Sequence, residues 1–141
     1  MPTQVFRAAL IGMATVVVFD AIASLASMSM GFDYAYASFG SMVVYAAFGY
    51  WTGRVSTIWF VPLVGALMGL ADATLGWFVS WILGPGRLEP EVLTPQTWAV
   101  VAIQVIAVAA LCALVGGVIG RYAPGRGAVR PNTSFERTRE G

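Results

Sequence analysis

Residues 95–120 read PQTWAVVAIQVIAVAALCALVGGVIG and contain no charged side chain. A helix needs about 20 apolar residues to cross the hydrocarbon core of a bilayer, and this stretch is long enough to do so. A strand of a membrane barrel would alternate polar and apolar residues with a period of two, which this stretch does not. Because a helix satisfies its own backbone groups, as lipid requires, residues 95–120 are predicted to form a transmembrane helix.

Three further stretches share this apolar character. They cover residues 8–30, 35–53 and 58–83, and Asp20 interrupts the first and Asp72 the third. Each is close to the length that spans a membrane. Glycine, proline and polar residues separate them, as in the turn at 53–57 and the loop at 84–95. The sequence therefore predicts an all-α, polytopic bundle of four transmembrane helices, at about 8–30, 35–53, 58–83 and 95–120.

The overall composition excludes the soluble globular class. Apolar residues make up 58% of the chain and charged residues 11%, whereas a soluble domain carries about 25% charge. The single cysteine excludes a disulfide framework, and the absence of histidine excludes imidazole catalysis and imidazole metal sites. We expect one transmembrane domain over residues 1–123, followed by a mobile basic tail over residues 124–141, which is rich in Arg, Gly and Pro.

The distribution of arginine predicts the orientation. With four spans, both termini and the turn at 53–57 lie on one side, and that side holds seven of the eight basic residues. The other side has only Arg87, together with Asp33, Glu89 and Glu91. Since positive residues mark the cytoplasmic face, we expect both termini to be cytoplasmic. The use of arginine without lysine is typical of a GC-rich bacterial genome, so the expected location is the bacterial inner (plasma) membrane.

The two halves of the membrane domain share a pattern. Residues 49–54 and 116–121 both read Gly-x-x-x-Gly-Arg, and Asp20 and Asp72 are each followed by alanine. This indicates a parallel duplication of a two-helix hairpin, or small residues that recur by chance. In either case, small residues let membrane helices approach closely. The glycines expected at helix contacts are Gly49, Gly53, Gly65, Gly69, Gly76, Gly116 and Gly120.

Asp20 and Asp72 are the strongest functional candidates. Both fall near the bilayer centre, where inserting a charged aspartate costs about 2.5–3.5 kcal/mol. No basic residue within either helix can reach them, so each is protonated, bound to a cation or hydrogen-bonded. The plain alternative is that each acid only fixes the register of its helix. If the two acids meet, they should titrate as a pair. The candidate hydrogen-bond donors are Ser24, Ser41, Tyr45, Thr74 and Gln104.

Two functions fit these features. The sequence has no nucleophile–base pair, metal-ligand set or phosphate-binding loop, so we expect no catalytic residues, no metal, no cofactor and no nucleic-acid partner. The first hypothesis is a homo-oligomeric proton- or cation-coupled transporter or channel, in which Asp20 and Asp72 bind the ion or proton with support from Ser24, Tyr45 and Gln104. A homo-oligomer is expected because four tightly packed helices leave little room for a pathway. The second hypothesis is a non-transporting membrane scaffold or assembly factor, whose small-residue stripes pack partner helices in the bilayer.

Overall fold

The computed structural model describes residues 2–85 and 94–123, and within these ranges the chain is helical without any strand, which confirms the predicted all-α class. Helix α1 spans Thr3–Met30, the 3-10 turn η1 spans Tyr34–Tyr36 and α2 spans Ala37–Val55. The next helix is continuous over Phe60–Leu83. It consists of α3 (Phe60–Ala71), the π-helical turn η2 (Asp72–Gly76) and α4 (Trp77–Leu83). Helix α5 spans Pro95–Tyr122. Arg87, Glu89, Glu91 and the predicted basic tail lie outside the described residues.

Local sequence signals explain where the helices begin and end. The Thr94 side chain caps α5 by accepting a hydrogen bond from the Thr97 amide at 3.1 Å, and Pro95 occupies the first helical position, where its missing N–H costs little. Gly31 ends α1 in the left-handed region, with φ of 71°, and its amide donates to the carbonyl of Ser27 at 2.9 Å. Glycine adopts this conformation without the steric penalty that a Cβ brings.

Three of the helices are long and apolar enough to cross a membrane: Thr3–Met30, Phe60–Leu83 and Pro95–Tyr122. Helix α2, predicted as a further span, is not among them, although its 19 residues would extend about 28 Å, close to the thickness of the hydrocarbon core. Its lower apolarity has a structural reason, because its small and polar residues face the inside of the molecule. The buried residues of α2 are Ser41, Tyr45, Gly49, Thr52 and Gly53. A fourth span therefore stays a prediction.

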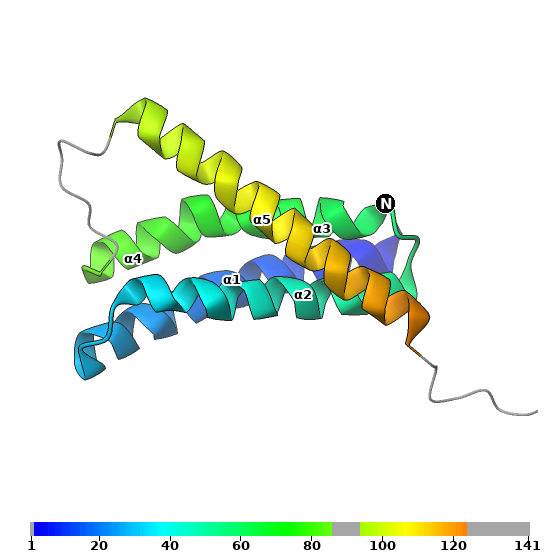
Figure 1. Cartoon of the computed structure of the whole chain (residues 1–141), viewed down its shortest axis with the longest axis horizontal. Helices are drawn as coiled ribbons and strands as arrows, with labels where there is room; N and C mark the ends of the chain where they lie inside the picture. The colour runs from blue at the N-terminus through cyan, green and yellow to red at the C-terminus, as the bar shows by residue number, and fades with distance from the viewer. Residues whose placement is uncertain (1, 86–93, 124–141) are drawn as a thin grey trace, which may run out of the picture.

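The helices are arranged so that one of them crosses the others at an angle. Helices α1, α2 and α3–α4 run side by side, and α5 lies obliquely across them (Figure 1). The backbone of α5 lies close to that of α2, α3 and η2, but among the described residues it does not come as close to the backbone of α1 or α4. The two ends of the molecule consequently differ: α5 lies close to α2 at one end and leans away from α4 at the other (Figure 1).

The charged residues distinguish these two ends. The start of α1, the turn from α2 to α3 and the end of α5 lie together, which brings Arg7, Arg54 and Arg121 to one end of the molecule, here called the arginine end (Figure 1). The opposite end, here called the Asp33 end, holds the connection from α1 to α2. Large apolar side chains remain exposed along all the helices, as lipid-facing residues would be.

Candidate functional site

Helices α2 and α5 touch backbone to backbone in the half nearer the arginine end. A Cβ added at Gly49 would lie 2.5 Å from the Cα of Ala113, and one at Gly53 would lie 2.7 Å from the Cα of Gly117. From the opposite helix, a Cβ at Gly116 would lie 2.7 Å from the carbonyl carbon of Ala46. A backbone cannot rotate away as a side chain can. Only glycine therefore permits this approach, and the approach closes the space between the two helices.

The remaining predicted contact glycines also lie against neighbouring elements. Gly65 and Gly69 face α5, where an added Cβ would come within 2.6 Å and 2.8 Å of the Cβ atoms of Ala113 and Ala109. Gly120 faces the backbone of Tyr50 on α2. Gly76 differs from the others, because its neighbours are two carboxyl groups rather than a helix backbone.

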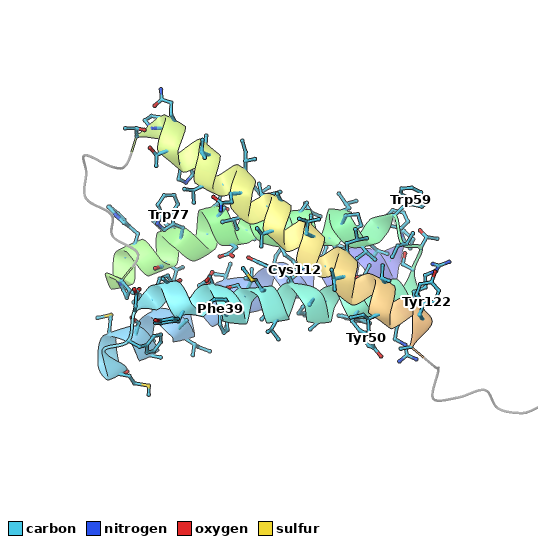
Figure 2. The ribbon with its side chains drawn as sticks, viewed as in Figure 1. Phe39, Tyr50, Trp59, Trp77, Cys112 and Tyr122 are labelled. Atoms are coloured by element: carbon cyan, nitrogen blue, oxygen red, sulfur yellow. The ribbon has the colours of Figure 1, made fainter. Side chains whose placement is uncertain are left out.

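The half nearer the Asp33 end contains a partly open cavity of about 650 Å³. Its walls come from α2 and from the half of α5 nearer the Asp33 end, with η2 and α4 on the third side. Figure 2 shows Trp77 in the space between α4 and α5, while Tyr50, Trp59 and Tyr122 lie at the arginine end. The cavity reaches from Asp33, Tyr34 and Pro85 inward to Asp20, Asp72 and Tyr45.

The inner end of this cavity is a pair of carboxyl groups. Asp20 on α1 is only 3% exposed, and its carboxyl interacts directly with that of Asp72 on η2. Gly76 makes room for both: a Cβ there would collide with Oδ2 of Asp20 and lie 2.9 Å from Oδ1 of Asp72. The Tyr45 hydroxyl donates a hydrogen bond to Oδ2 of Asp72. Three helical elements thus bring two acids and one phenol to a single point.

The π-helical turn is part of this arrangement. Asp72 is its first residue and Gly76 its last. A π turn inserts one extra residue into a helix, and such turns occur frequently at functional sites. Here the turn presents the Asp72 side chain and the bare backbone of Gly76 toward the same Asp20 carboxyl.

Three buried polar atoms near the pair have no hydrogen-bond partner among the described residues: Asp20 Oδ2, Ser24 Oγ and Ser80 Oγ. The two serines are fully buried, and Ser80 lines the cavity. The Tyr34 hydroxyl, in the η1 turn outside the spanning helices, lies within hydrogen-bonding reach of both serines, although neither serine oxygen makes a hydrogen bond of standard geometry. Burial raises the pKa of Tyr34, so its hydroxyl stays neutral.

The residues predicted to support the acids differ in what they contact. Tyr45 contacts Asp72 directly, and Gln104 and Ser41 line the cavity from α5 and α2. Ser24 is buried without a partner. Thr74 does not serve the acids, because its hydroxyl donates to the carbonyl of Leu70 at 2.6 Å within its own helix.

Sequence reasoning did not identify Tyr34 and Ser80 as site residues. Ser80 follows Gly65, Gly69, Asp72 and Gly76 along one stripe of the third helix, so a signal for it was present. Tyr34 carries no such signal, because its position depends on how the η1 turn folds back over the bundle.

Comparison with known proteins does not identify this site. No protein-family model, characterised protein or solved structure matches the chain. Among the described residues, no group of three or more His, Cys, Asp or Glu side chains is placed to hold a metal ion. The acidic groups that meet at this site are the carboxyls of Asp20 and Asp72, and such a pair can hold a shared proton or face a positively charged group.

Proposed function

We propose that this chain is a small proton- or cation-coupled membrane transporter in which Asp20 and Asp72 form the coupling site. One observation carries the proposal: a cavity leads from the Asp33 end to the carboxyl pair, whereas the glycine contacts of α2 and α5 close the arginine end. In this proposal, access to the pair from one end represents one state of a carrier, whereas an open channel would be accessible from both ends.

The burial of the pair supports a coupling role. Asp20 Oδ2 has no hydrogen-bond donor of its own, and an unpaired buried charge is costly. Either a proton shared with Asp72 or a cation from the cavity satisfies this oxygen. Two occupants that compete for one site are the basis of coupled exchange, because each can leave only when the other replaces it.

The alternative of a non-transporting scaffold has less support. It requires small-residue stripes that are free to receive partner helices. The seven predicted contact glycines are instead occupied by contacts within the chain, six against helix atoms and Gly76 against the acids. Packing within the chain therefore explains the small-residue stripes without a partner helix.

The setting of the proposed transporter follows the sequence predictions. We place it in the bacterial inner membrane with four spans, cytoplasmic termini and the cavity facing outward, because arginine marks the cytoplasmic side. The cavity forms within a single chain, so ion binding does not require a second copy. A homo-oligomer stays a prediction.

The proposal is tested by flux through proteoliposomes that contain a pH-sensitive dye. The full chain is reconstituted, and external sodium, potassium or organic ammonium chloride is added in turn. We expect at least one of these cations to shift the internal pH in the wild type. We expect Asp20→Asn and Asp72→Asn to lose the shift, because neither variant keeps two titrating carboxyls.

Thr74→Val is the matched control. Thr74 lies two residues from Asp72 on the same π turn, yet its hydroxyl bonds only within its helix, so the variant should transport as the wild type does. If no cation shifts the internal pH, or if both Asn variants transport normally, the transporter proposal is wrong and the scaffold hypothesis gains.

A further inference from the structure

We propose that the cavity binds a protonated organic amine, with the ammonium group at Asp20 and Ser80 and an apolar body along the inner face of α5. This inference names the substrate class of the proposed transporter and rests on the same carboxyl pair. It is carried by the size of the cavity, by the character of its walls and by the unpartnered polar atoms at its inner end.

The size and the walls of the cavity favour an organic ligand over a bare ion. Small-molecule sites typically enclose about 300–1,000 Å³, and this cavity has a volume of about 650 Å³. A small metal cation would instead need six to eight oxygen ligands in a compact shell. The walls away from the acids are largely apolar and aromatic. They include Met42, Trp77, Val101, Val105 and Val108.

The polar atoms at the inner end favour a group that carries N–H donors. Asp20 is 3% exposed and Ser80 fully buried. Oδ2 of the first and Oγ of the second make no hydrogen bond of standard geometry among the described residues, although Asp72 and Tyr34 lie beside them, and both residues line the cavity. We expect an ammonium group that enters this end to donate to the Asp20 carboxyl and the Ser80 hydroxyl and to balance the charge of the pair, whereas a quaternary ammonium has no N–H to donate. The aromatic faces nearby suit the cationic end of either ligand.

Protons should compete with the amine for this site. The titratable groups that face Asp20 and Asp72 are Tyr45 from α2 and Tyr34 from η1, and Cys112 from α5 lies near Tyr45. None of these carries a positive charge, so the positive partner of the pair is a proton or a ligand. We therefore expect amine binding to weaken as the pH falls.

The inference is tested by calorimetric titration of the full chain in detergent, without any flux. The probes are 2-phenylethylamine, its trimethylammonium analogue and the neutral 2-phenylethanol, which share one apolar body. We expect the primary amine to bind at least about tenfold more tightly than either analogue. Asp20→Asn should abolish this preference. Ser80→Ala should weaken binding of the primary amine by about 3- to 10-fold, the effect of one hydrogen bond, and leave binding of the trimethylammonium analogue unchanged.

The outcomes separate this inference from the proposed function. Equal binding of all three probes would show partition into an apolar space and overturn the inference, and equal binding of both cations would overturn the role of the N–H donors. Cation flux without amine binding refutes the substrate class alone, and amine binding without flux refutes transport alone. Thr74→Val serves as the folded control. If Asp20→Asn fails to fold, Ser80→Ala still decides the result.

Discussion

Replacing Gly116 with alanine should destabilise the chain by forcing α2 and α5 apart. The added Cβ would lie 2.7 Å from the carbonyl carbon of Ala46, and ordinary van der Waals contacts begin near 3.4 Å. The added Cβ would also collide with the carbonyl oxygen of Ala46, so the two backbones must separate by at least about 0.7 Å, the difference between these distances. A gap of this size forfeits about a quarter to a half of the dispersion energy of the contacts on either side.

The expected cost follows from two opposing effects. Overpacking of a close contact costs about 1–3 kcal/mol, and the better helix propensity of alanine returns about 1 kcal/mol. Because the collision is with backbone atoms of Ala46, the cost lies at the upper end of this range and the expected net loss is about 2 kcal/mol. Gly49 makes the reciprocal contact with Ala113 in the same interface. One separation of the helices relieves both overlaps. The double variant Gly49→Ala/Gly116→Ala should therefore cost less than the sum of the single variants, by at least about 0.5 kcal/mol.

The measurement is the free energy of unfolding in mixed micelles, from SDS titration followed by tryptophan fluorescence. Gly12 provides the control, because it faces the Met68 side chain, with the added Cβ 2.6 Å from Sδ, in a different helix pair. Gly12→Ala and Gly116→Ala should add within about 0.5 kcal/mol. If the Gly49/Gly116 pair is also additive, or if Gly116→Ala stabilises the chain, the close α2–α5 contact is not formed as described.

Three further predictions concern stability. Tyr45→Phe leaves Asp72 without its hydrogen-bond donor and should lower the free energy of unfolding by about 1–3 kcal/mol in the same SDS titration. Tyr50→Phe removes an exposed hydrogen bond with Arg54 and should lower it by almost nothing. Equal effects of the two variants would contradict the Tyr45 contact. Thr94→Ala removes the side-chain cap of α5. It should lower the free energy of unfolding by about 1 kcal/mol and speed hydrogen exchange at the Thr97 amide. Unchanged exchange there would show that the cap is not formed. Gly31→Ala puts a residue with a Cβ at a left-handed backbone position that has no neighbouring atom within 4 Å. Only backbone strain should therefore lower the free energy of unfolding, by about 1–2 kcal/mol. A stabilised variant would contradict the observed end of α1.

Much of the fold follows from local signals in the sequence. Apolar runs bounded by glycine and proline place the helices within a few residues, and Thr94-Pro95 marks the start of α5 where the structure has it. The shared pattern of acids and glycines, with Asp20 and Asp72 at similar depths, suggested that the two carboxyls could meet. The structure brings them together beside Gly76.

The rest depends on geometry that composition does not encode. A π turn adds one residue to a helix without changing the kind of residues present, so Asp72–Gly76 has no sequence signature. The cavity arises because α5 crosses the other helices obliquely (Figure 1). That angle is set by the summed contacts of many small residues. Helix α2 was predicted as a span and is not among the helices apolar enough to be one, although Ser41, Tyr45 and two of its glycines are buried on one face, as their spacing of three and four residues indicates.

The proposed exchange of a proton for a cation at Asp20 and Asp72 can be tested directly as proton release on ligand binding. Wild-type chain in weakly buffered detergent solution, with a pH indicator, is titrated with pH-matched 2-phenylethylamine hydrochloride. The account predicts release of up to about one proton per amine bound, and none from the Asp20→Asn/Asp72→Asn double variant. Amine binding by the wild type without proton release would contradict it.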